Sequence, residues 1–179
     1  MSASKKNANS APIKIGIAGC LLGNEVRWNG GHKFDSFIVN TLGQYVDFVT
    51  VCPEAECGLG IPRETMDLAG DPAAPRLIRT KTKEDKTEQM RGWAEKRLKA
   101  LAGEDLCGYI FKTKSPSCGM HGLRVFADQK KDFYNGVGIF TRMFMDYFPR
   151  LAFIDEGMLR DPGLRETFIE QIFSMRRRP

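Results

Sequence analysis

Three short apolar segments of this sequence are each followed by a cysteine, and this feature constrains the fold more than any other. The segments, which have the composition of buried β-strands, lie at residues 13–18, 48–51 and 106–111. The cysteines that follow them are Cys20, Cys52 and Cys118. Segments with a helical pattern lie at residues 34–42, 84–102, 135–147 and 163–177. Strands that alternate with helices predict an α/β fold, here a single domain whose mainly parallel central sheet is flanked by helices.

The length of 179 residues suits one domain with a sizeable core. The polar residues 1–12 are expected to form a disordered tail, and they lack the apolar core of a secretion signal. No segment reaches the roughly 18 uncharged apolar residues that a membrane helix needs. We therefore expect no membrane partner and a cytoplasmic location. Residues 53–75, with their four prolines and three glycines, are expected to form a long loop.

The formal charge of +5 comes from the two ends of the chain. Lys5, Lys6 and the three arginines at 176–178 account for all of it, so the rest of the chain is balanced. One internal block, residues 76–99, carries nine basic against four acidic residues. A solvated helix face is the favoured interpretation of this block, and a surface that contacts phosphate is the alternative.

Five cysteines and no export signal argue against a disulfide framework. Cys107 lies inside an apolar strand and is interpreted as a small core residue. Cys20, Cys52 and Cys118 follow separate strands, and ligands of parallel sheets bind where the carboxyl ends of the strands meet. Thiolates select zinc, copper or an iron–sulfur cluster. The Cys-x2-Cys pairs of structural zinc sites are absent, so a cluster held by widely separated cysteines fits better. Cys57 is a fourth candidate ligand.

At these cysteines the chain resembles the 2-thiouracil desulfidase (TudS) family, from about residue 13 to residue 126. The motifs that carry the resemblance are Cys-Leu-Leu-Gly at 20–23, Val-Arg-Trp-Asn-Gly at 26–30, Cys-Pro-Glu at 52–54, Gly-Leu-Gly-Ile-Pro-Arg-Glu at 58–64 and Lys-Ser-Pro-Ser-Cys-Gly at 114–119. The resemblance implies a [4Fe-4S] cluster held by Cys20, Cys52 and Cys118, with the fourth iron free to take the sulfur of a thiocarbonyl substrate. A fourth thiolate would block that iron, so Cys57 is expected to be a bystander.

Two polar residues beside these cysteines are candidates for catalysis. Glu54 is placed to act as the general acid/base that activates water and returns a proton, and its alternative role is a loop carboxylate paired with Arg63. Ser115 can orient water or hold the substrate ring, and its alternative role is a turn-forming serine before a proline. Arg27, Arg63 and Lys114 are further candidates for substrate contact, each with a structural or solvated role as the alternative.

The expected domains are a cluster-binding core at 13–135 and a C-terminal helical extension at 136–179. Residues 148–157, 161–162 and 164–166 resemble the junction to a second domain in longer relatives that act on thiouridines, including thiolated tRNA. The expected function is removal of sulfur from thiolated uracil or thiouridine, as free base, nucleoside or in tRNA, which releases sulfide and leaves the oxo base. The alternatives are a non-catalytic [4Fe-4S] module (an electron carrier or sensor completed by Cys57) and an RNA-binding accessory domain acting through residues 76–99.

Overall fold

The centre of the molecule, described here from a computed structural model, is a four-stranded parallel sheet. The structure describes residues 12–127 and 131–176. The strands are β1 (Ile13–Ala18), β2 (Val46–Val51), β5 (Leu106–Phe111) and β8 (Ala152–Asp155). They lie in the order β2-β1-β5-β8, and every neighbouring pair is parallel. The α/β prediction is confirmed, although the strand β8 was not predicted.

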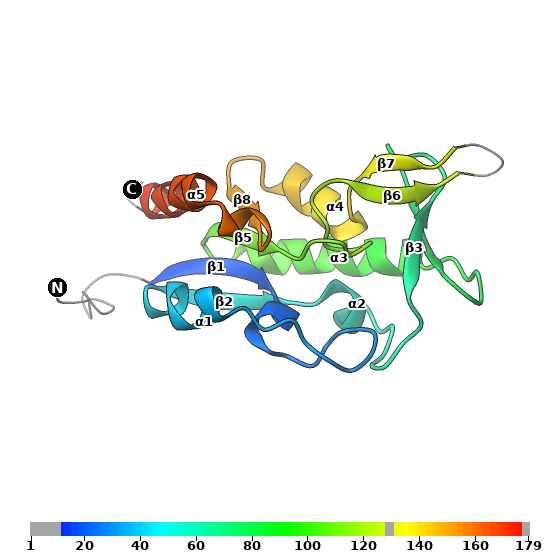
Figure 1. The fold of residues 1–179 in the computed structure, drawn as a ribbon, viewed down its shortest axis with the longest axis horizontal. Coiled ribbons are helices and arrows are strands. Elements are labelled where there is room, and N and C mark those ends of the chain that lie inside the picture. The colour runs from blue at the N-terminus through cyan, green and yellow to red at the C-terminus, as the bar shows by residue number, and fades with distance from the viewer. Residues whose placement is uncertain (1–11, 128–130, 177–179) are drawn as a thin grey trace.

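Helices cover both faces of this sheet (Figure 1). The helices are α1 (Ser36–Asn40), α2 (Pro53–Glu56), α3 (Thr87–Ala102), α4 (Ile139–Tyr147) and α5 (Pro162–Met175), and the short 3-10 helices are η1 (Gly19–Leu22), η2 (Leu42–Gln44) and η3 (Met158–Arg160). The predicted helices at 34–42, 84–102 and 163–177 correspond to α1 with η2, α3 and α5. Helix α4 starts later than the predicted residue 135, because residues 133–136 form a strand.

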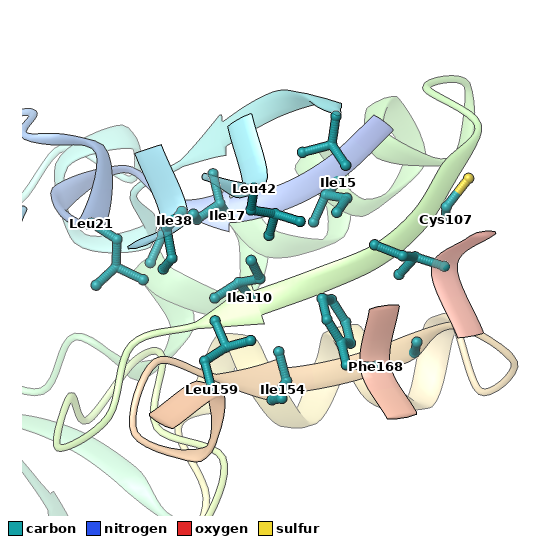
Figure 2. Close-up of a cluster of buried hydrophobic side chains, with 14 of the residues drawn as sticks. Ile15, Ile17, Leu21, Ile38, Leu42, Cys107, Ile110, Ile154, Leu159 and Phe168 are labelled. Carbon is teal, nitrogen blue, oxygen red and sulfur yellow. The ribbon is translucent and has the colours of Figure 1, made fainter. Parts of the chain in front are cut away.

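Two apolar clusters join the helices to the sheet. Figure 2 shows one of them, in which Ile15 and Ile17 of β1 and Ile110 of β5 pack with Ile38 of α1 and Phe168 of α5. On the opposite face, α3 and α4 pack against Tyr109 and Phe111 of β5. These two residues flank Ile110 in the strand, so their side chains point to the other side of the sheet. Gly16 of β1 is required there, because a Cβ at this position would lie 2.2 Å from the Tyr109 ring.

A second, mixed sheet was not predicted. It consists of β3 (Met66–Ala69), β4 (Arg76–Arg79), β6 (Leu123–Phe126) and β7 (Phe133–Gly136) in the order β4-β3-β6-β7. It lies beyond the carboxyl ends of the main-sheet strands (Figure 1). The prediction of one long loop at 53–75 is therefore wrong, since α2 and β3 both lie within it. The predicted tail at 1–12 lies outside the described residues, except for Pro12.

Candidate functional site

A cavity of about 470 Å³ opens at the carboxyl ends of β1, β2 and β5. Cys20 enters it from η1, directly after β1, and Cys52 enters it from the position between β2 and α2. Cys118 enters from the loop that connects β5 to β6. The structure therefore brings together the three cysteines that the sequence places after separate strands.

Each of these thiols is held by its own local turn. Gly19 and Cys20 form the tight turn that closes β1, where the Cys20 carbonyl accepts hydrogen bonds from the N–H groups of Gly23 and Lys33. Cys52 precedes Pro53 at the start of α2, and its Sγ lies 3.6 Å from the Val26 carbonyl oxygen.

The Cys118 loop is held by the start of α4. Three N–H groups at the beginning of this helix have no partner within the helix, and they donate to carbonyls of the loop. These bonds are Gly138 to Gly119 (2.8 Å), Ile139 to Pro116 (3.1 Å) and Thr141 to Ser117 (3.2 Å). The backbone around Cys118 is therefore fixed by a helix that packs on the main sheet.

Burial makes all three thiols weak acids. It raises the pKa of Cys20 to about 11, with a further contribution from Cys52, while Lys112 and Arg27 act in the opposite direction. Burial also raises the pKa of Cys52, and that of Cys118 lies well above 9.0, through burial first and then the proximity of Cys52. Three thiolates in one cavity require positive charge between them, and a thiophilic metal centre supplies it.

The chemistry of the donors bears on the kind of metal centre. Within residues 12–127 and 131–176, no three His, Cys, Asp or Glu side chains lie close enough together to hold a single metal ion. The three cysteines nevertheless line one cavity. Three thiolates from separate loops are the kind of donor set that holds an iron–sulfur cluster.

Glu54 lies in the wall of the same cavity with both carboxylate oxygens engaged. Its Oε2 accepts hydrogen bonds from Arg63 Nε at 2.8 Å and lies 2.7 Å from Arg63 Nη2. Its Oε1 accepts from Ser117 Oγ at 2.7 Å and lies 3.4 Å from Ser115 Oγ. The ion pair with Arg63, which was the alternative role of Glu54, is thus present, and it orients the carboxylate beside the serines and the cysteines.

The two serines link Glu54 to the Cys118 loop. Ser115 Oγ accepts the N–H of Cys118 at 3.1 Å and lies 3.0 Å from Ser117 Oγ. Ser117 is almost fully buried and was not predicted as a site residue. Its position in Ser-Pro-Ser-Cys, one residue before the third cysteine, was the available signal.

The basic residues of the wall fall into two groups. The side chain of Arg63 is buried and bonded to Glu54, to the Gly60 carbonyl and to the Val26 carbonyl, so its role is to hold the site together. Arg27 and Lys114, the other two candidates for substrate contact, line the cavity, and neither pairs with an acid in the described part of the chain. Two other basic residues of the wall, Lys33 and Lys112, were not predicted, and neither was the aromatic wall residue Trp28.

The two remaining cysteines lie away from the cavity wall. Cys57 ends α2, its Sγ lies 3.5 Å from the Glu54 carbonyl oxygen, and it packs against the apolar cluster under the second sheet. Burial raises the pKa of Cys57 to about 11. Cys107 lies in the core cluster between β5 and α5.

Comparison with known proteins agrees with this arrangement. The model of the 2-thiouracil desulfurase family matches residues 15–156. A solved structure described as a [4Fe-4S]-dependent thiouracil desulfidase, TudS, has the same fold, with a TM-score of 0.65 and 24% identity over 87% of this chain and 98% of that chain. A search of the curated proteins finds no match. The family model covers most of the chain, which therefore belongs to the 2-thiouracil desulfurase family.

Proposed function

We propose that this protein is a desulfidase that depends on a [4Fe-4S] cluster and removes sulfur from thiolated uracil. The observation that carries the proposal is the single cavity lined by Cys20, Cys52 and Cys118 together with Glu54 and Ser115. The solved structure with the same fold is described as a [4Fe-4S]-dependent enzyme of this kind, which supports the assignment. None of the helices in the described ranges is long and apolar enough to cross a membrane.

The three cysteines would hold the cluster as thiolates. When bound, such a cluster supplies a thiophilic Lewis acid that accepts the departing sulfur of a thiocarbonyl group. Cys57 is outside the cavity wall, which supports a cluster with three protein ligands rather than four.

The role of the protein side chains is to bind the base and move a proton. The Glu54 carboxylate is the general base for the attacking water and returns the proton to the product. Arg63 holds Oε2 of this carboxylate, so Oε1, which faces the serines, is the oxygen that exchanges the proton. The hydroxyls of Ser115 and Ser117 complete the path between Glu54 and the Cys118 loop.

The wall of the cavity also bears on the substrate class. Arg27, Lys33 and Lys114 line it without an acidic partner in the part of the chain that the structure describes. These cations favour a substrate that carries negative charge beside the base, so thiouridine in nucleotide or tRNA form is included in the proposal. A cytoplasmic location, a second domain outside this chain and the division at residue 136 stay predictions.

The test is an assay of sulfide release by protein purified without oxygen. 2-Thiouracil, 4-thiouridine and thiolated tRNA are supplied in parallel, and iron and sulfide are quantified in the same preparations. Cys118→Ser is expected to lose the cluster and the activity, because a hydroxyl is a poor iron ligand next to thiolate. Cys107→Ser is the matched control, since Cys107 lies in the core cluster. No sulfide from any substrate with a full cluster would overturn the proposal.

The two alternative functions have less support. An electron carrier with four cysteine ligands requires Cys57 at the cluster, and Cys57 does not line the cavity. An RNA-binding surface at 76–99 requires free cations, but several in that block are paired with acids. The pairs are Arg76 with Asp85, Arg79 and Lys86 with Glu84, Arg91 with Glu88, and Arg97 with Glu56.

A further inference from the structure

Two consecutive acids at the end of β8 are buried beside the Cys118 loop. Asp155 is 1% exposed and Glu156 is 8% exposed. Charged side chains are rarely this buried unless they are paired. Both face the chain that leaves β5: Asp155 Oδ2 lies 3.1 Å from Nε2 of His121, and Glu156 contacts Lys112 and Thr113. Neither acid lines the cavity, so their burial needs another explanation.

Glu156 holds the backbone and the side chain of Thr113. Its Oε2 accepts the N–H of Thr113 at 2.8 Å, and its Oε1 accepts the hydroxyl of Thr113 at 2.6 Å. Oε1 also accepts Nζ of Lys112 at 2.5 Å, and that ammonium donates to the carbonyl oxygen and Oγ1 of Thr113 as well. The three protons of Lys112 are thus all used inside this network, which leaves none for a substrate.

The residue after Thr113 has an unusual backbone conformation. Lys114 has φ of 55°, in the left-handed region that residues with a side chain seldom adopt. Such a conformation persists where the surrounding structure enforces it, and it is common at functional sites. The turn at Lys114 leads directly into Ser115, whose hydroxyl contacts Glu54 and the N–H of Cys118.

We propose that Glu156 is a positioning residue for the site. It fixes Thr113, and through it the left-handed turn at Lys114, so that Ser115 and Cys118 point into the cavity. A carboxylate is required because every group that faces Glu156 is a donor. Glutamine would place an amide N–H against one of these donors. The inference deepens the proposed function, because Cys118 is one of the proposed cluster ligands.

The experiment uses the folded, metal-free chain and measures how fast each cysteine reacts with iodoacetamide at about pH 8.5, where a thiol that local opening exposes to solvent is partly ionised. Cys118 is 5% exposed, so its alkylation requires local opening of the loop. In Glu156→Gln, the rate at Cys118 is expected to rise about tenfold or more, because charge-assisted hydrogen bonds are lost. The rate at Cys107, in the core, is expected to stay at the wild-type value. Mass spectrometry assigns the label to each cysteine.

Two further variants keep the inference testable. Thr113→Val removes the hydroxyl contacts and keeps the hydrogen bond from the Thr113 N–H to Glu156. It is therefore expected to raise the Cys118 rate by about two- to fivefold. If Glu156→Gln does not fold, this variant tests the inference in its place. Glu104→Gln is the matched control, since its ion pair with Lys14 spans β1 and the start of β5 at the opposite end of the sheet. It is expected to leave all rates unchanged.

The inference is overturned if the Cys118 rate in folded Glu156→Gln stays within twofold of the wild type, or if Cys107 and Cys118 accelerate in parallel, which indicates general destabilisation. The labelling needs neither cluster nor substrate. A failed sulfide-release assay therefore leaves its outcome standing, and the two proposals can fail separately.

Discussion

Substitution of Gly138 by alanine tests how the start of α4 holds the Cys118 loop. An alanine Cβ at this position would lie 2.5 Å from the carbonyl carbon and oxygen of Ser117 and 2.8 Å from the nitrogen of Cys118. The backbone of Gly138, with φ of −60° and ψ of 145°, is allowed for alanine. The effect of the substitution is therefore steric, and the obstructing atoms are backbone that cannot rotate away.

The size of the effect follows from these distances. Carbon atoms in contact lie about 3.5–4.0 Å apart, so the loop or the helix must move by about 1 Å. Overpacking of this kind costs about 1–3 kcal/mol. Weakening of the backbone hydrogen bonds between α4 and the loop adds about 1 kcal/mol. We expect the free energy of unfolding to fall by about 2–4 kcal/mol, and the iron content to fall because Cys118 is displaced.

Urea unfolding followed by circular dichroism gives the stability, and iron analysis after anaerobic purification gives the cluster content. Gly92→Ala is the matched control: Gly92 lies within α3, and apart from the adjacent backbone of this helix no atom lies within 4 Å of a Cβ built there. This variant is expected to gain about 0.5–1 kcal/mol, because alanine is the better helix former. Wild-type stability and iron content in Gly138→Ala would refute the reasoning.

Three further predictions concern single residues of the site. Glu54→Gln is expected to keep its iron while sulfide release falls about 10²- to 10⁴-fold, and near-normal turnover would remove Glu54 from the mechanism. Cys57→Ser is expected to keep its iron where Cys118→Ser loses it, and loss of iron from the former would make Cys57 a ligand. Burial alone would raise the pKa of Glu156. Hydrogen bonds from Lys112 and Thr113 outweigh burial and lower the pKa below 4.5. The stabilisation from Glu156 is therefore complete above pH 4.5 and lost as the pH falls through the lowered pKa, so urea titrations at several pH values should show a shallower acid loss of stability in Glu156→Gln.

Part of the fold follows from patterns that single segments carry. The strand at 106–111 is recognisable because its six residues are all apolar or small, and the structure buries all six. Helix α3 is recognisable because its apolar residues recur at helical spacing. The strands of the second sheet have four residues each, and those of β7 are mostly exposed. Patterns this short and this polar are not distinguishable from loops. The four-residue helix α2 was hidden for the same reason in a segment rich in proline and glycine.

The site also has residues that the sequence predicts and residues that only the structure reveals. Cys20, Cys52 and Cys118 were recognisable because each follows a strand, and parallel strands end at one edge of a sheet. The roles of Ser117 and Glu156 depend on contacts across 63 and 43 residues of sequence, and no local pattern marks such contacts. The ion pair between Glu54 and Arg63 was weighed as an alternative to catalysis, whereas the structure contains the pair within the cavity wall.

The most direct test of the central claim is the iron and acid-labile sulfide content of the anaerobically purified protein, measured beside single serine variants of the five cysteines. The account predicts about four irons and four sulfides per chain, as a [4Fe-4S] cluster requires, with a loss in Cys20→Ser, Cys52→Ser and Cys118→Ser. It also predicts no loss in Cys57→Ser and Cys107→Ser. Zinc in place of iron, or a full cluster that survives replacement of any of the three cavity cysteines, would contradict it.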